Sequence, residues 1–189
     1  MAHRSQAEDW GLLEGQLREC YGRVVYSHKT HEKCSDILLD RLSAIKFWQI
    51  VLSALTTGGF VSTFFDAANI GAIIGVIIST ILLVLNAYTK NYDLGELAQK
   101  HKQAANELWL IREKYLSLLT DLKLSERDLD HIKERRDDLL EELHGTYVGS
   151  PSTTFDAYRK AQEALQTKED MTFSDDEIDA FLPSELRRS

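Results

Sequence analysis

Two long apolar runs dominate the pattern of hydrophobic and polar positions along the chain. Residues 47–65 and 70–88 are 19 residues each and contain no Asp, Glu, Lys, Arg or His. A helix of this length spans about 28 Å, close to the roughly 30 Å hydrocarbon thickness of a bilayer. The connector, DAAN at residues 66–69, has a composition typical of a tight turn. The pattern predicts a transmembrane hairpin. The alternative is a buried hairpin in a soluble bundle, which rarely needs two such uncharged runs.

On both sides of the hairpin, mostly apolar residues recur at alternating steps of three and four residues. The seam before it consists of Trp10, Leu13, Leu17, Cys20, Val24, Ser27, His31, Cys34, Leu38, Arg41 and Ile45. The seam after it consists of Leu94, Leu97, His101, Ala104, Leu108, Ile111, Tyr115, Leu118 and Leu122. This spacing predicts long coiled-coil-like helices, the first of which runs into the first membrane span. The two helices should pack together, because a hairpin returns the chain to the side that it left.

Capping signals divide the rest of the chain into shorter helices. The helix after the hairpin should end near Lys123, and Ser125 should cap the next helix with Asp128 at its third position. That helix is expected to reach His144, with Gly145 just past its end.

Two more helix starts follow a predicted loop at residues 146–152. Thr153 with Asp156 indicates one start, and Ser174 with Glu177 indicates another. The fold class is therefore an all-α membrane protein. Its parts are an amphipathic helix over residues 1–46, the transmembrane hairpin over 47–88, cytoplasmic helices over 89–145 and an acidic helical region over 146–189.

Charge indicates the orientation of the hairpin. Lys and Arg are absent from the connector, and they flank the outer ends of the two spans at Arg23, Lys29, Lys33, Arg41, Lys46, Lys90, Lys100 and Lys102. Because such residues remain in the cytoplasm, both termini should face the cytoplasm. Residues 121–189 hold 18 acidic and 10 basic side chains, which account for the whole net charge of −8. An acidic surface argues against direct binding of nucleic acid.

The two spans also carry small and polar residues on one face each. On the first span these are Gln49, Ser53, Thr56 and Thr63, together with Phe60. On the second they are Gly71, Ala72, Gly75, Ser79 and Asn86, and the opposite face is Ile70, Ile73, Ile77, Ile81 and Val84. In an antiparallel hairpin, Gln49 lies at the depth of Asn86 and Thr56 at that of Ser79. Phe60 lies opposite Gly75, and Phe64 opposite Gly71.

Two interpretations of these faces remain open. Small residues allow helices to approach closely, and polar groups bond between helices, so the faces could serve packing within one chain. Polar residues within a membrane also face water-filled interiors, so several copies could assemble with this face lining a pore. Such a pore would be weakly selective among ions or closed by a hydrophobic constriction at Phe60.

Candidate chemistry elsewhere is sparse. His28, His31 and Cys34 are spaced for metal ligands on one helix face, but no second Cys/His group completes a four-ligand site. The other interpretation is a polar stretch that meets the helix after the hairpin near His101. No phosphate-binding loop, nucleophile elbow or HExxH motif is present, so we expect no enzyme, no metal and no cofactor.

Three stretches resemble one known family. They are YSHKTHEKCSDILLDRLSAIKFWQIVLSALTTGG at residues 26–59, YTKNYDLGELAQKHKQAANELW at 88–109 and FSDDEIDAFLPSELR at 173–187. They are similar to the SLATT family, the SMODS- and SLOG-associating two-transmembrane effector domains of prokaryotic conflict systems. The ending resembles a subgroup that is linked to reverse transcriptases.

The resemblance implies a membrane effector of antiviral or abortive-infection systems. Such an effector is expected to form a homo-oligomer and to perforate or depolarise the inner membrane. Its trigger is expected from an operon-encoded partner, either a nucleotide-signal synthase, a SLOG protein or a reverse transcriptase. The alternative function is a non-conducting anchor in the lipid bilayer whose acidic helices recruit a partner.

Overall fold

The computed structural model describes residues 6–62, 70–124, 128–168, 171, 173–174 and 177–178. Its helices are α1 (Gln6–Ser62), α2 (Ile70–Asn91), α3 (Leu94–Leu124), α4 (Leu129–Gly149) and α5 (Phe155–Gln166), and the described residues contain no strand. The all-α prediction is therefore confirmed for these residues.

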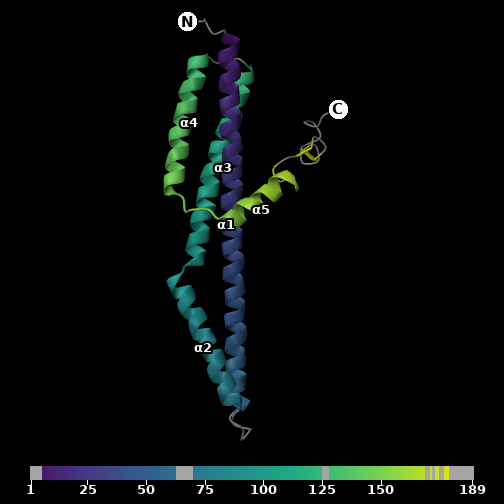
Figure 1. The fold of residues 1–189 in the computed structure, drawn as a ribbon, viewed down its shortest axis with the longest axis vertical. Coiled ribbons are helices and arrows are strands. Elements are labelled where there is room, and N and C mark those ends of the chain that lie inside the picture. Colours follow the sequence, from purple (N-terminus) through teal and green to yellow (C-terminus); the bar gives the residue numbers. More distant parts are fainter. Residues whose placement is uncertain are drawn as a thin grey trace.

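Helix α1 is the axis of the molecule. It contains 57 residues without interruption, so it is about 85 Å long. The predicted amphipathic helix and the described part of the first apolar run therefore form one helix. Figure 1 shows α2 and then α3 returning along α1, α4 lying beside α3, and α5 crossing α1 near its middle. The two chain regions on either side of residues 63–69 thus lie side by side.

The apolar core lies between α1, α3 and α4. Its buried members are Leu13, Leu17, Cys20, Val24, Leu108, Ile111, Tyr115, Leu118, Leu122, Ile132 and Leu139. All the members from α1 and α3 belong to the two predicted seams. In α4, Ile132 and Leu139 are about two helical turns apart, so they lie on the same face of that helix, which packs on the core.

The predicted seams are wrong at two positions. Arg41 is exposed, and Leu42 instead lies against the start of α3, where a β-carbon on Gly95 would be 3.5 Å from its Cδ2 atom. Leu97 is exposed in the same way, and Ala98 is buried in its place. A straight helix has 3.6 residues per turn rather than 3.5, so a strict seven-residue seam drifts away from the contact face over a helix this long.

The ends of α4 also differ from the prediction. Asp128 precedes the helix in an extended conformation (φ −67°, ψ 147°) rather than occupying its third position, and the expected cap, Ser125, lies outside the described residues. The helix passes through Gly145 and ends at Gly149, so the predicted loop begins only at Ser150. Burial of Thr146 and a 2.7 Å hydrogen bond between the Tyr147 and Ser27 hydroxyls supply contacts that extend the helix beyond its local stop signal.

Of the two other predicted helix starts, the first is shifted by one residue and the second is confirmed. The cap of α5 is Thr154 rather than Thr153, since the Thr154 hydroxyl accepts the Ala157 N–H at 3.3 Å. The Ser174 and Glu177 pairing is confirmed in both directions. The Ser174 N–H donates to a Glu177 carboxylate oxygen at 2.8 Å, and the Glu177 N–H donates to the Ser174 hydroxyl at 3.3 Å.

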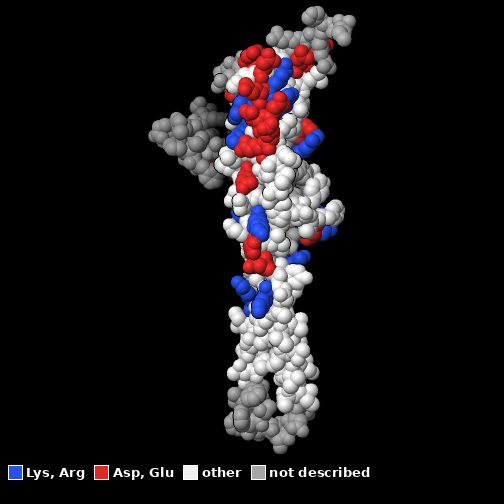
Figure 2. Space-filling view, turned by 90° about the vertical axis from the view of Figure 1, so that its left-hand side faces the viewer, with Lys and Arg blue, Asp and Glu red and all other residues white. Residues whose placement is uncertain are grey.

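Charge is distributed unevenly along the long axis. Figure 2 shows blue and red side chains over the upper part of one face, whereas the described residues of α2 and the end of α1, below them, are white. Blue side chains lie just above this white zone. In the sequence, Arg41, Lys46 and Lys90 flank the uncharged runs. Within Gly71–Leu124 one helical stretch is long and apolar enough to cross a membrane, and none of it is buried inside the structure.

The core contact of Leu108 provides a test of this packing. Leu108 is 0% exposed, whereas Leu110 on the same helix is 46% exposed. Leu108→Ala should lower the free energy of unfolding by about 3 kcal/mol, because it leaves a cavity in the core. In detergent-solubilised protein that change should lower the melting temperature by roughly 6–12 °C. Leu110→Ala is the matched control, and equal shifts for the two variants would contradict this core.

Candidate functional site

An amide pair connects α1 to α2 in the uncharged zone, the part of the molecule formed by α2 and the end of α1, at the end of that zone nearest α3. Gln49 Nε2 donates to Asn86 Oδ1 at 2.9 Å and lies 3.4 Å from Thr89 Oγ1. The sequence analysis placed Gln49 and Asn86 at equal depth in an antiparallel hairpin, and this hydrogen bond confirms that they pair. An amide hydrogen bond in an apolar medium holds two helices in one register, because the unpaired alternative exposes polar groups to hydrocarbon.

The contact face of α2 follows a regular seam. Its half-buried residues are Gly71, Gly75, Ile78, Leu82, Leu85 and Thr89, which alternate steps of four and three. The half-buried residues on the facing part of α1 include Ile45, Gln49, Leu52 and Thr56. The sequence analysis missed the contribution of Ile78, Leu82 and Leu85, because isoleucine and leucine in an apolar run look the same whether they face lipid or a helix. The four-three spacing was the signal that could have found them.

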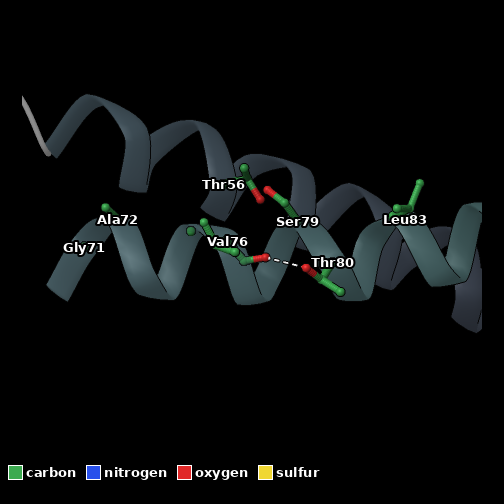
Figure 3. A pocket seen from close by; sticks show the side chains of 8 residues that line it. Thr56, Gly71, Ala72, Val76, Ser79, Thr80 and Leu83 are labelled. Carbon is green, nitrogen blue, oxygen red and sulfur yellow. Dashed lines mark hydrogen bonds between the residues drawn. The ribbon is translucent and has the colours of Figure 1, made fainter. Parts of the chain in front are cut away.

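A cavity of about 430 Å³ opens beside this seam. It is lined by Thr56, Gly71, Ala72, Gly75, Val76, Ser79, Thr80 and Leu83. In Figure 3 the Thr56 and Ser79 side chains point toward one another from the two helices, as their equal depth predicts. A β-carbon on Gly75 would meet no atom within 4 Å, so this glycine opens space in the described structure.

The other predicted residues of this face lie in different places. Ser53 is exposed on α1, and Ala72, Ser79 and Asn86 are exposed at the edge of the α2 seam. Thr63 and Phe64, and the side chain of Phe60, lie outside the described residues, so the pairs with Gly75 and Gly71 stay predictions. The predicted lipid face is exposed at each of its described side chains, which are Ile73, Ile77, Ile81 and Val84.

Most hydroxyl groups in this zone bond to their own helix. Thr56, Thr57, Thr80 and Thr89 each donate to the carbonyl oxygen four residues earlier, at 2.8–3.1 Å. Figure 3 shows the bond from Thr80 to the Val76 carbonyl. A hydroxyl that is satisfied in this way can face lipid or another helix without water. The polar residues alone therefore do not require a water-filled lumen.

A second polar cluster lies between α1 and α3, above the uncharged zone. Nδ1 of His31 and Nδ1 of His101 are 3.0 Å apart, and both residues are buried. The interpretation of this stretch as a polar contact near His101 is thus confirmed. The Glu32 carboxylate accepts from Lys29 Nζ at 3.2 Å and from Lys102 Nζ at 3.3 Å. Nothing in the sequence indicates the bond between Glu32 and Lys102, which are 70 residues apart.

Burial determines the protonation of these histidines. Desolvation, and then the charges of His101 and His28, lower the pKa of His31 to about 4. Desolvation also lowers the pKa of His101, and it lowers the pKa of His28 despite the nearby Glu32 carboxylate. All three rings are therefore neutral at pH 7. Within the described part of the chain no three His, Cys, Asp or Glu side chains gather as ligands for a metal ion.

Comparison with known proteins gives one match. The family described as SMODS and SLOG-associating 2TM effector domain family 4, SLATT_4, matches residues 13–177. The searches of curated proteins and of solved structures gave no match. The matched range covers both apolar runs and all of α2, α3, α4 and α5.

Oxidative cross-linking can test how α2 lies on α1. In a chain with Cys20→Ser and Cys34→Ser, the pair Thr56→Cys and Ser79→Cys should form a disulfide, because the two side chains face one another across the helices (Figure 3). The matched pair is Thr56→Cys with Ile77→Cys, since Ile77 is 55% exposed on another face of α2. Mobility on a non-reducing gel measures the yield. Similar yields from the two pairs would contradict this packing.

Proposed function

Because the chain belongs to the SLATT family, we propose that it is a membrane effector of a prokaryotic antiviral or abortive-infection system. Copies of the hairpin assemble in the inner membrane and open a pore, or otherwise dissipate the membrane potential. The observation that carries this proposal is the uncharged zone, where α2 and the end of α1 present exposed apolar side chains such as Ile50, Ile77 and Leu83. A surface of this kind is stable in hydrocarbon rather than in water.

The basic side chains above the uncharged zone support the orientation. Arg41, Lys46 and Lys90 flank the two apolar runs, and the connector at residues 66–69 has no Lys or Arg. Lys and Arg are retained on the cytoplasmic side. We place both termini there, with α3, α4 and α5 beneath the inner face of the membrane.

The groove beside the α2 seam supports association between copies. Its small residues Gly71, Ala72 and Gly75 allow another helix to approach closely. Ser79 in its lining and Asn86, further along α2, are exposed for bonds between chains. An exposed amide within or near hydrocarbon is better satisfied by another chain than by lipid. This homo-oligomer is the species that we propose disrupts the membrane.

The trigger comes from a partner in this proposal. The family description names SMODS and SLOG associations. A nucleotide-signal synthase, a SLOG protein or, in the subgroup that the ending resembles, a reverse transcriptase would supply the signal. The chain itself is not an enzyme in this proposal, and it needs no cofactor and no direct contact with nucleic acid.

A second candidate function follows from the bonds within the spans. Because the threonine hydroxyls bond to their own helix and Gln49 bonds to Asn86, the hairpin can be stable as a single anchor. The exposed carboxylates of α4, which include Glu134, Asp137, Asp138, Glu141 and Glu142, would then recruit a partner. The two functions differ in what the polar residues of the spans do.

Membrane potential after induced expression distinguishes the two functions. Induced overexpression favours the homo-oligomer by mass action even without the trigger. The effector should therefore collapse the potential within minutes, as measured with a voltage-sensitive dye, at an expression level that inserts the protein correctly. The triple variant Gln49→Leu, Thr56→Leu and Asn86→Leu should lose most of this effect, because it removes the polar groups through which the spans pair and associate.

The matched control carries three substitutions, as the triple variant does, but at exposed apolar residues. Ile50→Leu, Ile73→Leu and Ile77→Leu keep the lipid-facing surface and should keep full activity. Membrane fractionation must show equal insertion of all variants. A normal potential with the inserted wild-type protein would contradict the effector function, and full activity of the triple variant would favour the anchor.

A further inference from the structure

The two buried histidines between α1 and α3 share a contact that admits only one hydrogen atom. The Nδ1 atoms of His31 and His101 are 3.0 Å apart, the ring centroids are 5.1 Å apart, and the residues are 3% and 2% exposed. One ring must donate its Nδ1–H and the other must accept with a bare Nδ1. A protonated imidazole carries hydrogen on both nitrogens, so two protonated rings would place two N–H groups against one another.

We propose that the His31–His101 pair is an acid-sensitive latch, which holds α3 to α1 while one Nδ1 is bare and releases it when both rings carry a proton. The latch belongs to the part of the molecule outside the uncharged zone. It operates whether or not copies of the hairpin form a pore, so its test does not depend on that proposal.

The neighbouring charges do not compensate a second proton. On α1 the pair is next to His28, Lys29 and Glu32, and on α3 it is next to Lys102. The Glu32 carboxylate is already shared between the two ammonium groups, and it lies 3.9 Å from Nε2 of His28. A further positive charge on the pair would therefore add to a neighbourhood that already holds two cations and one anion.

Other charged and titratable groups near the pair add no negative charge that would offset a second proton. Arg112 of α3 acts on His28 as a further positive charge. On the side of α4 and α5, the groups that face His31 are the phenols of Tyr147 and Tyr158, with Tyr26 of α1 beside them. Phenols are neutral across the acidic range.

Water reaches the pair without unfolding of the core. A cavity of about 320 Å³ lies beside His31, and its wall is formed by α1, the end of α4, the connection to α5 and α5 itself. Its lining is rich in hydroxyl groups, including those of Ser27, Tyr147 and Ser152, and it contains no Asp, Glu, Lys or Arg among the described residues. A proton can thus arrive through ordered water.

The direction of the effect follows from the depressed pKa values. The latch is fully closed above the ordinary histidine pKa of about 6.5, and it weakens as the pH falls from there toward the pKa of about 4 that burial and the neighbouring rings give His31. Burial lowers the pKa of His101 in the same sense. Within that window each ring can raise the ratio of open to closed latch by up to about tenfold per pH unit.

Two native cysteines can report the opening. Cys34 lies one turn after His31 on α1 and is 3% exposed, whereas Cys20 is 8% exposed within the apolar core. The full chain in lipid nanodiscs would carry either Cys20→Ser, to follow Cys34, or Cys34→Ser, to follow Cys20. The probe is 2,2′-dipyridyl disulfide, which reacts with thiols in acid, and each rate is divided by that of the denatured chain at the same pH.

From about pH 7.5 to about pH 5, the relative rate at Cys34 should rise at least tenfold. Cys20 should change by less than about threefold, because the apolar core holds no titrating pair. His31→Asn should make the rise at Cys34 at least about threefold smaller, since the asparagine oxygen accepts from His101 and takes up no proton, so that only His101 is left to be protonated. His144→Asn, on the exposed surface of α4, is the matched control and should leave the rise intact.

Three results would overturn the latch. They are a Cys34 that stays protected at the lower pH, a rise of undiminished size in His31→Asn, and a rise of equal size at Cys20, which would mean general unfolding. Protection of Cys20 at the higher pH shows that the His31→Asn chain is folded. If that variant is unfolded, His101→Asn makes the same test from the other ring.

Discussion

The continuity of α1 constrains the rest of the molecule. Because one helix of 57 residues holds both the buried seam that packs on α3 and the uncharged run, every other helix is positioned against the same rigid axis. Helix α3 packs on its charged part and α2 on its apolar part, so the core and the amide pair lie on one line. No separate linker exists within α1 that would let the two parts rotate independently.

Much of this arrangement could be predicted from sequence because it depends on spacing. Leu17 and Leu108 fall on seams that the repeat of three and four residues identifies, and both are completely buried. The spacing fails where the helix is long, as at Arg41, because the true period drifts from the ideal one. Gly145 shows the other source of error. A local signal for a helix end is overridden when residues beyond it, here Tyr147, make tertiary contacts.

The candidate site was predictable only in part for a related reason. Equal depth in a hairpin paired Gln49 with Asn86, because two amides in an apolar run have few other partners. The contact face itself consists largely of Ile78, Leu82 and Leu85, which cannot be separated from lipid-facing neighbours by residue type. A contact of the polar stretch around His31 with the next helix near His101 was predicted, but the pairing of the two Nδ1 atoms required the exact register of two helices that are separated by the hairpin, which composition does not provide.

The path from α3 to the uncharged zone passes through a break in the returning chain. The Asp93 carboxylate accepts the Glu96 N–H at 2.8 Å and so starts α3 as a helix separate from α2, which ends at Asn91. A separation of the first turns of α3 from α1 near His101, with the core intact, would therefore be taken up at residues 92–93 rather than by bending one continuous helix. Gln49, whose side chain contacts Asn86 and Thr89 near the end of α2, lies on the other side of that break. Since α1 runs past both without interruption, the His31–His101 contact and this amide pair are two attachments of the returning chain to one rigid helix, with the break between them.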